Sequence, residues 1–297
     1  MTSSAAQGRG AERRRALGAR FIFLGPGLFY VTLFMAIPMV LVLSYAFLTR
    51  GRFGGVQMEF TLENFSRVMD SVYLSVIGNS ILIATITTIL ALLIGYPTAY
   101  AISRLPRKWR NIVLVMVVLP FWTNFLIRTY AWIVLLNTEG PLNKGLMAVG
   151  ILDQPLELLY TRGAVIAGLL YAYLPLMILP IYASVERLDK SLIEAATNLG
   201  ASRIRAFFTV TLPLTLPGTM IGAIFVFVPS LGNFIVPELL GGGKTVMIGN
   251  LIRDQFLKSR DWPFGAVLAL IMVALLVLLF AGQAAISRRI NGRGRHA

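Results

Sequence analysis

The chain has 297 residues, of which 57% are hydrophobic and only 13% are charged. Soluble domains carry about 25% charged residues, so a water-soluble fold would have nowhere to place this much apolar surface. Cysteine is absent and the single histidine, His296, is the penultimate residue. Disulfides, cysteine nucleophiles and histidine-based metal sites are therefore excluded. The composition predicts an integral membrane protein with no metal site.

Six segments are apolar and long enough to cross a bilayer as helices, since about 20 residues span the hydrocarbon core. This predicts an all-α membrane fold. The first segment is too long for a signal peptide. The expected order is a basic tail at 1–20, a first span at 21–49, an outside loop at 50–73, a five-helix core at 74–287 with spans at 74–103, 112–136, 163–184, 218–240 and 263–287, and a basic tail at 288–297.

The distribution of charge predicts the orientation of these spans. With the N-terminus inside, most of the 27 lysines and arginines fall in inside segments, and most of the 13 acidic residues fall in outside loops. Cytoplasmic loops of membrane proteins carry this excess of basic residues. Both termini are therefore predicted to be cytoplasmic. The same asymmetry explains the net charge of +14 without a nucleic-acid partner.

The inside segment at 186–217, between the fourth and fifth spans, begins with a predicted short helix. Ser191 is its expected N-cap, and Glu194 stands three residues later as the capping-box partner. Gly200 suits a left-handed residue that ends the helix. The pattern predicts a glycine-terminated helix on the inner side of the membrane.

A second helix is predicted over 202–211, with one face formed by Ile204, Phe207, Phe208 and Thr211. Pro213 and Pro217 are expected to break the chain before the fifth span. Helix, glycine turn, helix and proline exit together predict a compact knob. Its projection from the membrane suits it to bind a cytoplasmic partner.

This segment resembles the EAA loop of binding-protein-dependent ABC importer permeases. That loop has Glu-Ala-Ala, a glycine six positions after the glutamate and a later Leu-Pro, which are matched here by Glu194, Ala195, Ala196, Gly200, Ala201, Leu212 and Pro213. Asn198 departs from the pattern, because many relatives carry aspartate there. The resemblance implies the type I ABC importer permease fold and a first short helix that couples to an ATPase.

The resemblance also implies partners and a location. It implies two copies of an ATP-binding subunit, a second permease subunit and an extracytoplasmic solute-binding protein, all at the inner membrane of a bacterium. ATP is expected in the partner subunit and no cofactor in this chain. Residues 241–245, Gly-Gly-Gly-Lys-Thr, lack the first glycine of a P-loop, since Glu238 occupies that position.

Further stretches resemble one branch of the family, the first permease subunit of spermidine/putrescine uptake systems. They lie at 120–133, 234–243, 247–250 and 260–265. The resemblance implies a polyamine as the small-molecule solute, moved by alternating access. A permease of the same architecture for an amino-acid derivative or opine-like compound is the alternative.

Polar and aromatic residues at membrane depth are candidates for the solute route. A polycation favours carboxylates, aromatic faces and amide oxygens, so Glu238 fits this role whereas Arg128 opposes it. A structural pair of Arg128 with Glu238, or snorkelling of these side chains to the membrane interface, is the competing interpretation. The candidate set is Trp122, Asn124, Arg128, Asn233 and Glu238.

Two other classes of protein fit the sequence less well. A membrane-embedded enzyme needs clustered reactive groups, but the carboxylates here are scattered along the chain. An ion-driven secondary transporter would work without an ATPase and would have no use for the predicted knob. The outer-loop pairs Arg253-Asp254 and Arg260-Asp261 are expected to be solvated charges.

Overall fold

The computed structural model describes residues 25–293, with side chains up to 285. The predicted tail at 1–20 and the last residues of the chain lie outside this part. Within it, five helices are long and apolar enough to cross a membrane, and a bent pair brings the number to six if it counts as one span. The five are Gly25–Tyr45, α4 (Ser71–Ser103), α8 (Arg162–Glu186), Arg203–Gly232 and the apolar part of α14 (Trp262–Arg293).

Shorter elements connect and extend these helices. The first long helix includes the π-helical turn η1 (Thr32–Ala36) and α2 (Ile37–Tyr45), and the fourth comprises α10 (Arg203–Ala206), the π-helical turn η3 (Phe207–Thr211) and α11 (Leu212–Gly232). The remaining elements are β1 (Leu48–Arg50), β2 (Val56–Phe60), α3 (Glu63–Arg67), α5 (Arg107–Val118), the 3-10 turn η2 (Leu119–Trp122), α6 (Phe125–Leu136), α7 (Pro141–Ala148), α9 (Lys190–Asn198), α12 (Ile235–Gly241) and α13 (Ile248–Leu257).

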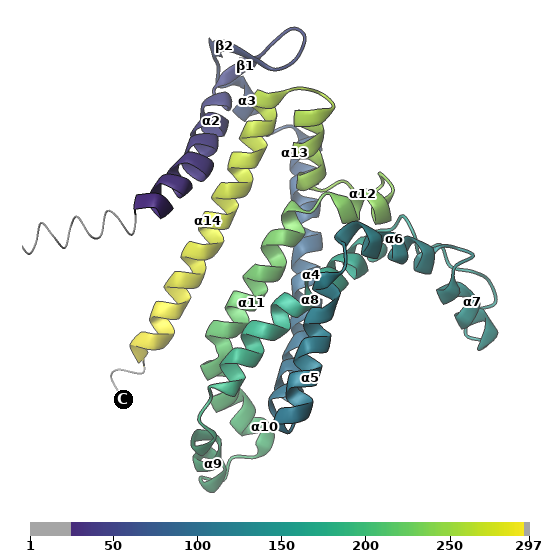
Figure 1. Cartoon of the computed structure of the whole chain (residues 1–297), viewed down its shortest axis with the longest axis vertical. Coiled ribbons are helices and arrows are strands. Elements are labelled where there is room, and N and C mark those ends of the chain that lie inside the picture. The colour runs from purple at the N-terminus through teal and green to yellow at the C-terminus, as the bar shows by residue number, and fades with distance from the viewer. Residues whose placement is uncertain (1–24, 294–297) are drawn as a thin grey trace, which may run out of the picture.

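The centre of the bundle is formed by α4, α8 and α11, which pack on one another along their lengths (Figure 1). Small residues permit this close approach, as is usual for helices in membranes. A Cβ atom on Gly95 would lie 2.9 Å from the Met177 side chain, and one on Gly222 would lie 3.0 Å from the same side chain. Residues from all three helices form one buried apolar cluster around Met177 and Val226.

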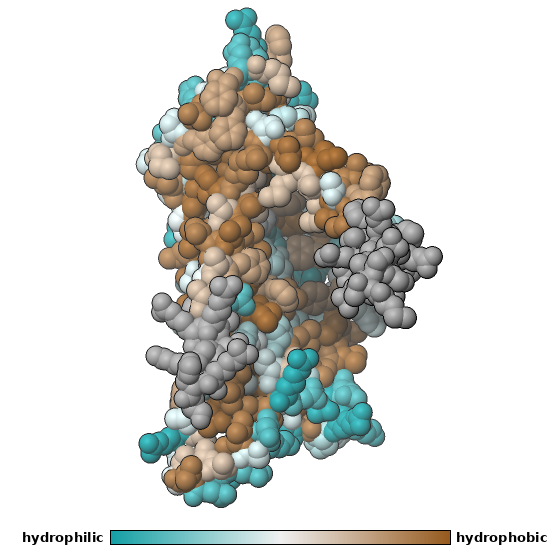
Figure 2. All heavy atoms as spheres, turned by 90° about the vertical axis from the view of Figure 1, so that its left-hand side faces the viewer, coloured by the Kyte–Doolittle hydropathy of each residue, from teal (hydrophilic) through white to brown (hydrophobic). Residues whose placement is uncertain are grey.

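The first span lies outside this central bundle. Its second half, α2, packs on α14, and no residue in its apolar window is buried within the chain. Figure 2 views the side of the molecule on which α2 lies, and hydrophobic side chains cover much of its middle while hydrophilic ones gather at its lower end. A helix that buries so little against its own chain is suited to lipid or to another membrane subunit.

The third predicted span, 112–136, is not a straight helix. Its residues belong to α5, η2 and α6, and the helices before and after the break are bent by 94°. Pro120 lies in the 3-10 turn, Thr123 is extended, and the Asn124 side chain caps α6 by accepting the Leu126 N–H at 2.8 Å. A cap of this kind starts a new helix instead of continuing the old one. The predicted span 112–136 is therefore bent sharply near its middle.

The fifth predicted span also differs from the structure. The prolines before it do not break the chain, because Arg203–Gly232 is one helical segment. The π-helical turn η3 directly precedes Pro213, and such a turn changes the backbone hydrogen-bond pattern where a proline lacks a donor. The helix stops instead at Asn233, which is extended, and α12 follows. Span five therefore ends before the predicted Leu240.

The upper end of the molecule in Figure 1, opposite α9, carries a small antiparallel hairpin, β1–β2, which the sequence did not predict. Arg50 donates to the Ser259 carbonyl at 2.6 Å and holds the hairpin against the loop before α14. Asp261 in that loop is 1% exposed and pairs with Arg67 of α3 at 2.9 Å. The prediction that Asp261 is solvated was wrong, because α3 packs over it.

The Asp261→Asn variant is expected to lose about 1 kcal/mol of stability, because a hydrogen bond to a charged group becomes one between a neutral group and Arg67. The hydrogen bond from the Phe264 N–H to Oδ1 at position 261, which is 3.2 Å long with Asp261, can remain in the variant. Thermal unfolding of the purified permease in detergent measures the difference. Asp153→Asn, at an exposed residue, is the control. Equal melting temperatures for the two variants would contradict a stabilising role for the Asp261–Arg67 pair.

Candidate functional site

The predicted coupling helix is α9, which lies at the lower end of the bundle formed by α4, α8 and α11 in Figure 1. Its N-cap is Asp189 and not Ser191, because the Asp189 carboxylate accepts the Ser191 N–H at 2.9 Å. That backbone hydrogen bond holds the pKa of the exposed Asp189 carboxyl below its ordinary value. The capping box of Ser191 with Glu194 does not form.

The end of α9 is as predicted. Gly200 has φ +84°, its N–H donates to the Thr197 carbonyl at 2.9 Å, and the Ala201 N–H donates to the Ala196 carbonyl at 3.0 Å. These two bonds define a Schellman motif, which needs a left-handed residue at the position of Gly200. Leu199, just before the turn, is 89% exposed. The helix therefore presents an apolar tip away from the bundle.

The Asp189→Ala variant is expected to loosen the first turn of α9, because its N–H groups lose their side-chain acceptor. The contribution of the cap is present above the ordinary carboxyl pKa and is lost as the pH falls through the lower pKa of the folded state. Hydrogen exchange of residues 190–198 at neutral pH should be faster in this variant. Asp189→Asn keeps an acceptor and should resemble the wild type. Identical exchange in the alanine variant would show that α9 does not depend on this cap.

The second helix of the predicted knob does not have a single apolar face. Phe207 packs edge-on against the rings of Tyr96 and Tyr100 of α4, and Thr211 is buried. Ile204 and Phe208 are exposed. Because α10 and η3 continue into α11, the predicted coupling residues Leu212 and Pro213 begin a helix of the bundle. A movement of α9 can therefore be passed to α11 without a flexible joint at the prolines.

The break between α11 and α12 is the second predicted site. Asn233 is 9% exposed, donates to the Tyr173 hydroxyl of α8 at 2.7 Å and accepts the Val236 N–H at 2.9 Å. Phe125 and Phe234 lie beside it around a pocket of about 390 Å³. Tyr173 was missed by the sequence analysis, which looked for charged and amide groups inside the spans.

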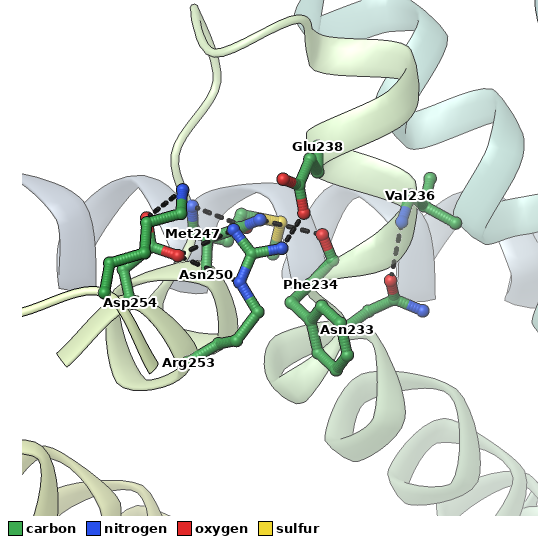
Figure 3. A network of polar contacts seen from close by, with 9 residues as sticks. Asn233, Phe234, Val236, Glu238, Met247, Asn250, Arg253 and Asp254 are labelled. Atoms are coloured by element: carbon green, nitrogen blue, oxygen red, sulfur yellow. Dashed lines mark hydrogen bonds and ion pairs between the residues drawn. The ribbon is translucent and has the colours of Figure 1, made fainter. Parts of the chain in front are cut away.

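Glu238 does not pair with Arg128, so the predicted structural pair is wrong. Its partner is Arg253 of α13, which also donates to the Asp254 carboxylate at 2.6 Å (Figure 3). Burial alone would raise the pKa of Asp254, but hydrogen bonds from Arg253 and Lys258 outweigh burial and hold that pKa below its ordinary value. The expectation of solvated charges at Arg253 and Asp254 was therefore wrong. Glu238, Arg253 and Asp254 therefore belong to one network that joins α12 to α13.

The other three candidates lie around the bend of the third span. Arg128 donates to the Pro120 carbonyl at 2.9 Å, and its guanidinium lies within 6 Å of three aromatic rings, those of Phe121, Phe125 and Tyr171. Asn124 caps α6, and Trp122 is 81% exposed. Phe125 lines the pocket at Asn233 and its ring lies 5.4 Å from the Arg128 guanidinium, so Arg128 and Asn233 lie near the same ring. Trp122 and Asn124 are not among the residues that line this pocket.

The comparison with known families decides what kind of protein carries these features. Residues 91–292 match the family described as the binding-protein-dependent transport system inner membrane component. The chain belongs to this family. The match begins inside α4, after the first span, and includes α9, the bundle and the break at Asn233. The permease is therefore a multi-pass, non-catalytic transport component of the inner membrane.

Two curated relatives extend the likeness to most of the permease. It is 41% identical over 262 residues to the spermidine/putrescine transport system permease protein PotB of Escherichia coli (strain K12), which covers 88% of this chain and 95% of the relative. It is 45% identical over 250 residues to the Haemophilus influenzae protein of the same name, which covers 84% and 87%. Because both matches cover more than 80% of this chain, the relatedness extends beyond the residues of the family match.

A solved structure confirms the predicted fold class. One chain in the crystal structure of a bacterial ABC transporter involved in the import of the acidic polysaccharide alginate matches the permease with a TM-score of 0.78. The match covers 95% of this chain and 99% of that chain, at 17% identity. At this identity the likeness shows the fold alone, which is the all-α ABC importer permease fold.

Proposed function

We propose that the permease moves polyamines such as spermidine and putrescine into the cell, driven by ATP that a separate subunit binds and hydrolyses. The observation that carries this proposal is the identity of 41% and 45% to spermidine/putrescine permeases along nearly the whole chain. No cofactor is assigned to this chain. The glycines at 242 and 243 have positive φ and form the turn after α12, a structural role that needs no nucleotide.

The proposed partners are two ATP-binding subunits, a second permease subunit and an extracytoplasmic solute-binding protein. The ATPase is expected to bind α9, whose side chains Leu192 and Leu199 are exposed next to the motif residues Glu194 and Ala195. Exposed leucines on a short projecting helix supply the apolar contact that a protein groove can bury. Both termini are proposed to be cytoplasmic, since the C-terminal end of α14 lies on the same side of the bundle as α9 (Figure 1).

The proposed mechanism is alternating access. Movement of α9 is expected to pass through the continuous helix Arg203–Gly232 to the break at Asn233, because no proline break uncouples the two ends. The pocket at Asn233 would then open toward one side or the other. This requires inward and outward forms that differ by only a few kcal/mol, so that partner binding selects between them.

Uptake measurements test the solute. Cells without polyamine uptake of their own, supplied with the permease, its second permease, ATPase and binding protein, should accumulate labelled spermidine and putrescine in a saturable manner. An inactive ATPase variant should abolish this uptake, which excludes an ion-driven transporter. Accumulation of an amino-acid derivative or opine-like compound without polyamine uptake would overturn the proposal in favour of another solute.

The solute route is proposed to pass the pocket at Asn233. Asn233→Ala should lower the rate or apparent affinity of uptake by about tenfold, because the solute loses an amide contact and Tyr173 loses its partner. Glu238→Ala should have a smaller effect if Glu238 serves mainly to bind Arg253. Uptake and ATP hydrolysis are measured together on the reconstituted complex. Normal transport by both variants would remove these residues from the route.

A further inference from the structure

A pocket of about 640 Å³ lies at the inner end of the bundle, between α9 and the adjoining ends of α4, α5 and α8. The polar groups around it include three cations, Arg104, Arg110 and Lys190, and two carboxylates, Glu186 and Glu194. Arg110 and Glu186 pair at 3.0 Å and neutralise each other. The remaining charges leave this inner pocket with an excess of positive charge and with Arg104 as its central cation.

Among the described residues, Arg104 has no anionic partner, and Arg110 has one nitrogen without a hydrogen-bond acceptor. Arg104 lies over the Tyr100 ring at 4.4 Å and donates to the Tyr100 hydroxyl, but it makes no ion pair there. The Arg110 Nε atom is buried and has no acceptor in this part of the chain. Because that atom has almost no accessible surface, the exposed Arg104 is the cation that a ligand in the pocket can reach. The pocket therefore offers donors that a phosphate group can use.

The position of the inner pocket in the membrane indicates where such a phosphate comes from. The pocket lies where α4 ends and α5 begins, at the end of the molecule that also carries α9 (Figure 1). Trp109 near the start of α5 is exposed, and the exposed apolar residues Ile112, Val115 and Met116 follow it along the helix. An exposed tryptophan followed by an apolar surface marks the boundary between headgroups and acyl chains. A free solute would not need this apolar surface.

We propose that the inner pocket binds the phosphate of an anionic phospholipid headgroup from the cytoplasmic leaflet. The assignment of the leaflet rests on the proposed function, which places α9 in the cytoplasm. Arg104 is the expected phosphate donor, and Lys190 at the first turn of α9 adds positive charge to the pocket. Basic pockets between membrane helices on the cytoplasmic side bind such headgroups. The lipid would join α9 to the ends of α4, α5 and α8.

Lipid retention by the assembled complex tests this proposal. The complex of both permeases and the ATPase is purified in the presence of phosphatidylglycerol or phosphatidylcholine, and bound lipid is counted by native mass spectrometry. The wild type should retain phosphatidylglycerol but not phosphatidylcholine. Arg104→Gln should weaken retention by about fivefold, since one basic residue near a membrane surface contributes about 1 kcal/mol. Lys108→Gln removes the same charge from an exposed residue of α5 outside the pocket and should retain lipid normally.

Three outcomes would overturn the proposal. Equal phosphatidylglycerol retention by the Arg104 and Lys108 variants would show that the pocket is not the site. Retention abolished by a millimolar excess of glycerol phosphate or inorganic phosphate, with no preference among lipids, would identify a free anion. Loss of the ATPase from the Arg104 variant, with lipid binding unchanged, would identify a carboxylate of that partner. Lipid retention needs no solute or ATP, so its failure leaves the polyamine proposal to be judged by uptake alone.

Discussion

Gly218→Ala is expected to destabilise the permease by about 2 kcal/mol, although alanine is the better helix former. Gly218 lies where α11 crosses α8. A Cβ at this position would overlap the Ser184 Oγ and would lie 2.6 Å from the Pro180 carbonyl oxygen. The hydroxyl can rotate away, but the backbone oxygen cannot, so the two helices must separate. Separation of the helices removes apolar contacts in the central bundle, including those of the buried cluster around Met177.

Thermal unfolding of the detergent-purified permease measures this effect, and Gly78→Ala is the matched control. Gly78 lies inside α4, and no atom lies within 4 Å of the position that its Cβ would take, so alanine there should be neutral or slightly stabilising. Adding Ser184→Gly to the Gly218 variant should restore only part of the stability, because the Pro180 oxygen remains. A Gly218→Ala permease as stable as the Gly78 variant would show that the helices have room to move apart at no cost.

Gly200→Val is expected to reduce transport by about tenfold or more without preventing membrane insertion. Gly200 adopts φ +84°, and a left-handed residue with a Cβ costs about 1–2 kcal/mol, with a further cost for a branched side chain. The turn would open and α9 would lose the two bonds of its Schellman motif. Because α9 is the proposed contact of the ATPase, transport should fall while the bundle stays folded.

Gly200→Asn is the control for this prediction, since asparagine visits the left-handed region at lower cost. Uptake and ATP hydrolysis are followed in the same reconstituted complex, and thermal unfolding reports on the bundle. The rate of uptake is expected to be highest in the wild type, lower in the asparagine variant and lowest in the valine variant. Wild-type uptake by the valine variant would mean that the shape of this turn has no part in coupling.

Local patterns in the sequence were sufficient for several features of the permease. The long apolar segments determine the membrane helices, because each such helix satisfies its own backbone hydrogen bonds whatever its neighbours are. The turn at Gly200 is local for the same reason: its bonds join residues at most five positions apart. Even so, the start of α9 was misplaced, because the Asp189 carboxylate, a strong acceptor, caps the helix two residues earlier by accepting the Ser191 N–H.

The partners of the ionisable residues depended on the tertiary structure. Glu238 pairs with Arg253, and Asp261 is buried beneath Arg67, which lies far from it in the sequence. Neither pair has a periodic signal, because each forms only when separate helices have packed. The stop at Asn233 likewise involves a distant residue, since the Asn233 amide donates to the Tyr173 hydroxyl of α8. The sequence by itself therefore determined the class of protein and the glycine turn that ends α9, whereas only packing decided which polar groups line the pockets.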